Sequence, residues 1–147
     1  MDSKTSMVAI KFSNAQNYTL TANYVASDII NIDWDQSITI YPFYTAGAGS
    51  SANTLQFQVE INPYSLALDS AGTYFKTIGT YTNSSGSHTE QDYVWNVAQG
   101  VASALRAGTP LTLTPILASR LRIKAKETVG AGSAGAVFFI ITKSNNL

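Results

Sequence analysis

Polar and apolar residues alternate with a period of two along most of this chain. The clearest case is the segment 55–62, LQFQVEIN, in which every second side chain is apolar. Successive side chains of a β-strand point to opposite faces, so this pattern predicts a strand with one buried and one solvated face. Alternation, or a high content of β-branched and aromatic residues, predicts further strands at 7–12, 18–21, 37–41, 73–82, 93–98, 111–113, 121–126 and 136–142.

Small and polar residues fill the segments between these predicted strands. Gly- and Ser-rich stretches, which are typical of turns, lie at 45–53, 83–87 and 130–135. Within the strand segments, Pro42 indicates a sheet edge or a bulge, and Gly79 indicates a bulge. Short strands at regular spacing predict an all-β fold, an antiparallel two-sheet sandwich with the jelly roll as the leading topology.

At most one short helix is expected. Residues 97–107 carry apolar side chains at helical spacing, and Gly108 stands where a helix C-cap would lie. The same residues also fit the end of a strand followed by an irregular loop. A shorter turn of helix is predicted at 64–68.

The chain has 147 residues, the length of a single domain. Residues 1–35 are less regular than the rest, and we expect them to form an N-terminal arm together with the first strands. Residues 36–147 are expected to form the core of the sandwich. The N-terminus lacks the pattern of a secretory signal, and the longest apolar stretch, 134–141, is far shorter than the roughly 20 residues of a membrane span. No membrane partner is predicted.

The composition disfavours several classes of function. The chain has no cysteine and one histidine, which disfavours thiol chemistry, zinc sites and a histidine-based triad. Nine basic residues balance nine acidic ones, so no net charge attracts the chain to nucleic acid. No phosphate-binding loop or nucleophile elbow is found. We therefore expect a protein that is not an enzyme and has no catalytic residues, no cofactor and no metal.

The histidine is the first alternative to this expectation. His88 lies in a polar turn with Glu90 and Asp92 close by. Metal sites need several converging ligands, so one histidine in such a turn fits a surface role better.

A second alternative is a group of aspartates. Asp33 and Asp35 flank Trp34, and Asp28 lies nearby. In an extended segment the two carboxylates share one face and the tryptophan takes the other. This arrangement fits a solvated edge beside a core tryptophan better than the facing carboxylates of a glycoside hydrolase. The segment also lacks the residue pattern of a calcium-binding loop.

The most patterned charges are Arg120, Arg122, Lys124 and Lys126, which strand alternation places on one face. One interpretation is a solvent-facing row of cations paired with acidic residues on a neighbouring strand. The other is a contact surface for an acidic protein partner, whose attachment would weaken as salt rises. No aromatic residues interleave with these cations, so a protein partner is favoured over nucleic acid.

Aromatic residues supply the remaining candidate positions. Tyrosine and tryptophan on strands pack in cores, form the centre of subunit interfaces, or line sugar-binding grooves. We predict an interface that includes Tyr41, Phe43 and Tyr44 together with the basic residues. The other tyrosines considered are Tyr74, Tyr81 and Tyr93.

Two pairs of segments resemble parts of small virion proteins of tailed bacteriophages. One pair is 118–127, ASRLRIKAKE, followed after a Gly/Ala/Ser turn by 136–141, AVFFII. The other is 79–82, GTYT, followed after a polar loop by 92–95, DYVW. In a Ser/Thr/Asn-rich, cysteine-free and nearly neutral chain, these segments resemble auxiliary capsid, or head decoration, proteins. The resemblance implies a jelly-roll-like protein that binds or stabilises the phage head as a trimer or another symmetric oligomer, and it assigns no functional residue.

Three hypotheses follow. The first is a non-enzymatic structural protein of the virion, made in the host cytoplasm, that binds the major capsid protein or another virion protein and forms a homotrimer or other symmetric homo-oligomer. The alternative is a carbohydrate-binding or receptor-binding sandwich module that uses exposed tyrosine and tryptophan. The weakest is a glycan-cleaving enzyme built on Asp33, Asp35 or Glu90.

Overall fold

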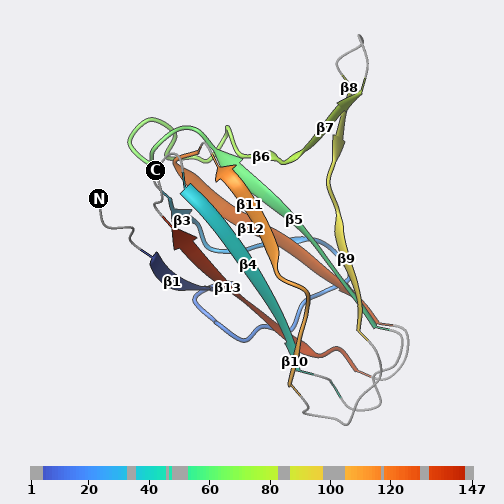
Figure 1. Cartoon of the computed structure of the whole chain (residues 1–147). Coiled ribbons are helices and arrows are strands. Elements are labelled where there is room, and N and C mark those ends of the chain that lie inside the picture. The colour runs from blue at the N-terminus through green and yellow to red at the C-terminus, as the bar shows by residue number, and fades with distance from the viewer. Residues whose placement is uncertain are drawn as a thin grey trace.

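The computed structural model describes residues 5–32, 36–45, 47, 53–82, 87–97, 105–116, 118–129 and 133–144, and every regular element in these ranges is a β-strand (Figure 1). This confirms the all-β fold. The strands are β1 (Thr5–Ile10), β2 (Val25–Ala26), β3 (Ile30–Asn31), β4 (Gln36–Thr45), β5 (Asn53–Asn62), β6 (Lys76–Thr77), β7 (Gly79–Thr82), β8 (Ser87–Glu90), β9 (Tyr93–Val97), β10 (Leu105–Ala107), β11 (Leu111–Ile116), β12 (Arg120–Thr128) and β13 (Ala136–Ser144).

The strands pair antiparallel in two sheets and one separate hairpin. The five-stranded sheet has the order β1–β13–β4–β10, and β11 also pairs with β4. The six-stranded sheet has the order β2–β12–β5–β6, with β3 also on β12 and β9 also on β5. Strands β7 and β8 pair with each other, and Figure 1 shows this hairpin extending away from the two sheets. The predicted antiparallel two-sheet sandwich is confirmed.

The order of the strands explains how the chain winds. Strands β1, β4, β10, β11 and β13 lie in the five-stranded sheet, whereas β2, β3, β5, β6, β9 and β12 lie in the other. The chain therefore crosses between the sheets after β1, β3, β4, β9, β11 and β12. If β2 with β3, β6 with β9, and β10 with β11 are each taken as one interrupted strand, this is the jelly-roll winding expected from the sequence.

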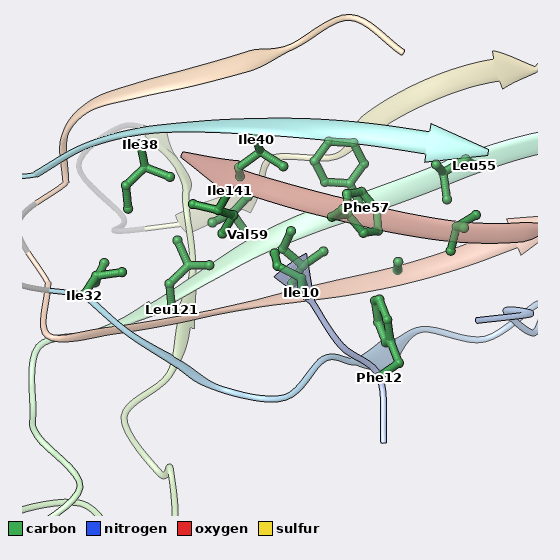
Figure 2. Close-up of a cluster of buried hydrophobic side chains, with 14 of the residues drawn as sticks. Ile10, Phe12, Ile32, Ile38, Ile40, Leu55, Phe57, Val59, Leu121 and Ile141 are labelled. Atoms are coloured by element: carbon green, nitrogen blue, oxygen red, sulfur yellow. The ribbon is translucent and has the colours of Figure 1, made fainter. Parts of the chain in front are cut away.

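The core lies between the two sheets and follows the alternation in the sequence. On β12, Leu121, Ile123 and Ala125 are fully buried, and their register partners are Ile61, Val59 and Phe57 on β5. Figure 2 shows Val59, Phe57 and Leu121 of this sheet in one cluster with labelled side chains from β1, β4 and β13, among them Ile10, Ile40 and Ile141. Each fully buried aliphatic side chain stabilises the fold by about 1.5–3 kcal/mol. The fully buried apolar side chains of the opposite sheet are Ile10, Ile38, Ile40, Tyr44, Val137, Phe139 and Ile141.

The structure corrects the predicted helix. Val97 ends strand β9 and Leu105–Ala107 form strand β10, so the described parts of 97–107 are extended, and residues 98–104 lie outside the described residues. Gly108 is not a helix cap, because its N–H donates a hydrogen bond to Pro42 O (2.8 Å). The turn of helix expected at 64–68 is a single turn, in which the N–H groups of Leu68 and Asp69 both donate to Ser65 O.

Residues 5–32 belong to the sandwich and do not extend from it as an arm. Strand β1 pairs with β13 along its whole length, and β2 and β3 pair with β12. Ile10, Phe12, Leu20 and Ile32 are buried in the core. The predicted first strands are therefore present, except that 18–21 contributes only an isolated bridge between Tyr18 and Val137.

Pro42 and Gly79 stand at irregular places, but not quite those predicted. Pro42 lies inside β4, which is central in its sheet. The carbonyl oxygen of Pro42 accepts a hydrogen bond from the N–H of Gly108, in the gap between β10 and β11. The nitrogen and the carbonyl oxygen of one strand residue point to the same side, so the Pro42 nitrogen also faces this gap. The missing N–H therefore faces an interruption in the pairing. Gly79 begins β7, where the chain leaves β5 for the hairpin, and a Cβ there would collide with the backbone oxygen of Thr89.

Candidate functional site

The four basic residues of β12 share the outer face of the six-stranded sheet, as their alternation predicts, but they are not equally exposed. Arg120 has 1% of its surface exposed, so the expectation that it belongs to a solvent-facing row is wrong. The side chains of Arg122 and Lys124 are 27% and 30% exposed. Lys126 is half-buried. Only part of this row therefore reaches solvent.

Arg120 is buried because the segment between β5 and β6 folds over it. Its Nε donates to Tyr64 O (2.9 Å), and its Nη2 donates to Asp69 O (2.7 Å) and lies 3.6 Å from Asp69 Oδ2. The guanidinium also lies 5.2 Å from the centroid of the Phe75 ring. Arg120 thus holds this segment against the sheet, a structural role.

Asp69 organises the same segment. It accepts hydrogen bonds from Asn62 Nδ2 (2.7 Å), Thr73 N (2.9 Å) and Tyr74 N (3.0 Å). Burial alone would raise the pKa of Asp69, but these three donors and the Arg120 charge lower the pKa below its ordinary value. The carboxylate therefore stays ionised and serves as the counterion of Arg120.

Arg122 and Lys124 share one carboxylate on the neighbouring strand. Glu60, directly opposite Arg122 on β5, accepts from Arg122 Nε (2.5 Å) and lies 3.7 Å from Lys124 Nζ. The Arg122 guanidinium also lies over the Phe75 ring, 4.3 Å from its centroid. These contacts fit the interpretation of a row of cations paired with acidic residues on the next strand.

A further network lies beside Lys126 on the same face. Asp92 Oδ1 accepts from the Tyr24 hydroxyl (2.7 Å) and from Gln58 Nε2 (2.7 Å). These hydrogen bonds lower the pKa of Asp92, while burial and the bond to Asp92 raise the pKa of Tyr24. The Lys126 ammonium lies 4.7 Å from the centroid of the Tyr24 ring. Tyr24 and Phe75 thus bring aromatic rings to the cations from distant segments, which the local sequence does not reveal.

The charges of this outer face balance. The three partly exposed cations Arg122, Lys124 and Lys126 stand among three carboxylates, Glu60, Glu90 and Asp92. We name these six residues with Tyr24 and Gln58 the polar face. Because each cation has an anion or a ring beside it within the chain, the polar face offers a weak field to an acidic partner.

The predicted aromatic interface divides between two environments. Tyr44 is fully buried, so its assignment to an exposed interface is wrong. Its hydroxyl donates to Glu127 Oε1 (2.7 Å), which also accepts from Asn53 Nδ2 and Gly135 N. Buried polar groups need such partners, and this network links β4, β5 and β12 at one end of the sandwich.

Tyr41 and Phe43 lie half-buried on the outer face of the five-stranded sheet. Phe43 stands directly opposite Phe138 on β13, and the rings stack with centroids 4.7 Å apart. Tyr41 stands opposite Ile140. We name the apolar residues that share these outward positions the apolar face: Met7, Ala9, Tyr41, Phe43, Leu105, Ala107, Phe138 and Ile140.

The apolar face is open to solvent and uncharged. Met7 is 71% exposed and Leu105 is 59% exposed. Among the described residues, the other outward positions of this sheet carry alanine, serine or threonine, and Thr39 and Thr112 join by their hydroxyls (3.0 Å). Apolar surface that is continuous across several strands marks a contact with another molecule more often than scattered apolar residues do.

A cleft of about 320 Å³ lies where the two sheets meet at an open edge. From the six-stranded sheet come Phe57 on β5, and Tyr93 and Trp95 on β9. Pro42, Pro110 and Leu111 come from the other sheet. The Tyr93 ring stacks on Phe57 with centroids 5.2 Å apart, and the Trp95 ring meets Tyr44 edge-on at 6.3 Å. The remaining lining residues are Asp92, Val94 and Thr109.

Two of the lining residues have free polar groups. Within the part of the chain that the structure describes, neither the Tyr93 hydroxyl nor the Trp95 indole N–H has a hydrogen-bond partner. Burial raises the pKa of Tyr93, so its hydroxyl stays protonated at neutral pH. The cleft therefore combines aromatic surface with donors able to bind a ligand.

The alternative catalytic and metal positions that the structure describes do not come together. His88 lies in strand β8 and not in the predicted turn, and both it and Glu90 are exposed. Asp28 is used locally, since its Oδ2 accepts from Asn14 N (3.0 Å). In the described ranges, no group of three or more His, Asp or Glu side chains is placed to hold a metal ion. Asp33, Trp34, Asp35 and the Tyr81 side chain lie outside the described residues.

Several important residues were missed from the sequence. The role of Glu60 can be inferred only from the register of β5 against β12, and the role of Tyr24 only from the pairing of β2 with β12. Asp69 had a local signal, because Asp69-Ser70-Ala71-Gly72 is a turn sequence and Gly72 has a positive φ of 70°. Tyr74, one of the aromatic candidate positions, is 52% exposed and packs on Tyr64 with ring centroids 5.0 Å apart.

Comparisons of the chain with protein-family models, with curated proteins and with solved structures gave no match. The described residues include no helix with the length and apolar character needed to cross a membrane.

Proposed function

We propose that the protein is a non-enzymatic structural component of a virus particle that binds another virion protein through its apolar face and associates as a symmetric homo-oligomer. The observation that carries this proposal is the outer surface of the five-stranded sheet, where apolar and aromatic side chains of β1, β4, β10 and β13 meet without a charged residue. The resemblance to phage decoration proteins and a fold also used by capsid domains support it.

The burial of such a surface supplies the driving force for association. Each apolar square ångström removed from water contributes about 25 cal/mol, and stacked aromatics contribute further as interface centres. The strands that carry this face are already paired along β1, β4 and β13, so little backbone conformational entropy is lost on binding. These properties suit a permanent contact between subunits of a particle.

The same properties change the sequence-based hypothesis about attachment. The sequence predicts an interface that combines the basic residues of β12 with Tyr41, Phe43 and Tyr44. In the structure Arg120 and Tyr44 are buried, and Arg122 and Lys124 already pair with Glu60. We therefore assign the contact to Tyr41, Phe43 and their neighbours on the apolar face. Attachment through this face should be insensitive to salt, because screening weakens contacts between charges.

Sedimentation of a matched pair of variants tests whether the apolar face mediates self-association. Phe43→Lys places a charge in the apolar face, and Val94→Lys places the same charge on the outer side of the other sheet, where Val94 is 58% exposed. We expect the wild type and Val94→Lys to sediment as the same oligomer, and Phe43→Lys to shift to monomer. A monomeric wild type, or equal behaviour of both variants, would contradict a role of the apolar face in self-association.

The particle itself provides the second test. Mass spectrometry of purified virus particles from cells that produce the protein should find it in a fixed ratio to the major capsid protein. Its retention should be equal in low and high salt and should be lost with Phe43→Lys. Finding the protein in the lysate but never in particles would exclude a virion role, whatever its oligomeric state.

A further inference from the structure

We propose that the edge cleft lined by Phe57, Tyr93, Trp95 and Asp92 binds a neutral monosaccharide or disaccharide. This site is separate from the apolar face and does not depend on the virion role. Strands β5 and β9 supply its aromatic wall, and β4 with the segment before β11 supplies the opposite wall.

The size and lining of the cleft favour a small ligand. Its volume of about 320 Å³ is at the lower end of the range for small-molecule sites, roughly 300–1,000 Å³. One face of the Tyr93 ring is occupied by Phe57, so a ligand would meet the ring edge or the other face. Sugar rings carry patches of C–H groups that pack against such aromatic surfaces.

The polar groups favour a ligand with many hydroxyls. The Tyr93 hydroxyl both donates and accepts, and the Trp95 indole N–H donates. Asp92 also lines the cleft, and its exposed carboxylate is held through Oδ1 by Tyr24 and Gln58 on the neighbouring polar face. A carboxylate can accept about four hydrogen bonds, so Asp92 keeps capacity for ligand hydroxyls. Donors and acceptors next to apolar rings complement a sugar better than a purely apolar ligand.

Charge selects a neutral sugar. The lowered pKa of Asp92 keeps it negatively charged at neutral pH, and Glu90 lies close enough to share the Gln58 amide with it. An acidic sugar such as a sialic acid would meet this negative charge at close range. A peptide is a weaker candidate, because its backbone would need a row of partners that these side chains do not provide.

The aromatic wall is held in position before any ligand binds. A Cβ on Gly108 would lie 2.8 Å from Pro42 Cγ and 3.0 Å from Trp95 Cε3, so the Trp95 ring packs directly against the backbone there. Tyr44 meets the same ring edge-on and is fixed by Glu127. A ligand therefore would not have to order Trp95, which favours binding.

The test uses the full chain and the NMR signals of its two tryptophans, Trp34 and Trp95. The indole N–H signals are assigned with Trp34→Phe. A panel of neutral methyl glycosides, lactose, maltose and cellobiose is titrated, with 3′-sialyllactose as the acidic counterpart of lactose. We expect at least one neutral sugar to shift the Trp95 signal in a saturable way, and sialyllactose to bind more weakly than lactose.

Variants connect the binding to the cleft. Trp95→Ala and Asp92→Asn should each weaken sugar binding tenfold or more, and Tyr93→Phe should weaken it several-fold while keeping the ring. Asp92→Asn should also reduce the discrimination against the acidic sugar. Tyr74→Ala, at an exposed tyrosine outside the cleft, is the matched control and should leave binding unchanged. If Trp95→Ala does not fold, the sugar binding of Tyr93→Phe and Asp92→Asn still shows whether the sugar occupies the cleft.

Three results would overturn the proposal. The first is that no neutral sugar shifts Trp95. The second is that Tyr93→Phe and Asp92→Asn bind as well as the wild type. The third is that a proline-rich peptide or a second copy of the chain, and not a sugar, perturbs Trp95 saturably. The first two results do not bear on sedimentation of Phe43→Lys, so failure of the sugar site can be told apart from failure of the apolar face.

Discussion

The polar face on β12 and β5 and the apolar face on β4 and β13 have the same strand geometry but opposite chemistry. On the polar face, Glu60 pairs with Arg122 and Lys124, and Asp92 binds Tyr24 and Gln58. On the apolar face, Phe43 and Phe138 stack on each other. The charged groups of the polar face have partners inside the chain, whereas the apolar face gains stability only by removal from water.

This difference shows why regular charge in a sequence is a poor guide to a binding surface. The row of basic residues on β12 is the most visible charge pattern of the chain. Yet Arg120 is a buried structural residue, and Arg122 and Lys124 form ion pairs within the chain. The apolar face has no motif, because its members come from four strands. A surface that lacks internal partners is the better candidate for an external one.

Replacement of Arg120 should produce the largest loss of stability. Arg120→Leu keeps an apolar side chain under the segment between β5 and β6 but leaves Asp69 and two backbone carbonyls without their donor. Removing one partner of a buried ion pair costs about 3–5 kcal/mol. Urea unfolding should show this loss, whereas Lys126→Gln on the same face should cost less than about 1 kcal/mol. Equal effects of the two variants would mean that Arg120 is no anchor.

Acid should weaken the fold through the same networks. The pKa of both Asp69 and Asp92 is lower in the folded chain than the ordinary value of 3.8, so the folded state binds their protons less tightly than the unfolded state. Their contribution to stability is complete above that value and is lost as pH falls through their lower folded pKa. The loss should be smaller than for Arg120→Leu, because a protonated Asp69 can still accept some of its hydrogen bonds.

Thermal melting between pH 6 and pH 2.5 measures this acid dependence. Tyr24→Phe removes the hydroxyl that donates to Asp92 and should make the decline less steep. A melting temperature that stays constant down to pH 2.5 would show that these carboxylates do not stabilise the folded state.

Loss of Arg122 should have an intermediate effect. Arg122→Gln removes the donor to Glu60 and the contact with the Phe75 ring, and Glu60 is nearly buried. We expect a loss of about 1–2 kcal/mol, whereas Lys124→Gln should cost below about 1 kcal/mol because its contact is longer and more exposed. Urea unfolding of both variants and of the double variant separates the two contributions.

The double variant also separates the two possible uses of the basic row. From the sequence, Arg122→Gln with Lys124→Gln is expected to weaken salt-sensitive attachment and leave the fold intact. From the structure, the same change should lower the melting temperature, and attachment to particles should survive. Salt-dependent detachment at an unchanged melting temperature would return the binding role to the polar face.

Alternation was enough to predict the fold, because each strand of a sandwich must bury one face. Leu121 to Ala125 shows this directly, since its buried positions are those that the pattern selects. On β5 the pattern correctly places Leu55, Phe57 and Val59 in the core, but Gln58 and Glu60, expected on a solvated face, are buried as well, among the hydrogen-bonded side chains of the polar face. Tyr44 obeys the same rule, because it alternates with Phe43, and only one of two adjacent side chains in a strand can face outward. Assigning both to an interface conflicted with that geometry.

The candidate sites were less predictable because they depend on contacts between distant segments. Trp95 and Pro42 are 53 positions apart in the sequence, and Asp69 and Arg120 are 51 apart. No local pattern can place such pairs together without the register of every intervening strand. Pro42 lines the cleft and lies beside the interruption between β10 and β11. The proline indicated an irregular place in the sequence but not where it would lie in the sheet.

The smallest effect is expected at His88, which belongs to neither face. His88 is exposed on β8, in the hairpin that extends from the sandwich, and it lies near the backbone of Gly79. Exposed positions outside the core change stability by about 0.5 kcal/mol or less when truncated, so His88→Ala should leave both the melting temperature and the sedimentation pattern unchanged. Gly79→Ala is the matched contrast, because its Cβ would press against the rigid backbone of Thr89 in the same hairpin. If His88→Ala alters assembly as strongly as Phe43→Lys, the hairpin and not the apolar face is the contact surface, and the comparison between the two sheets loses its functional meaning.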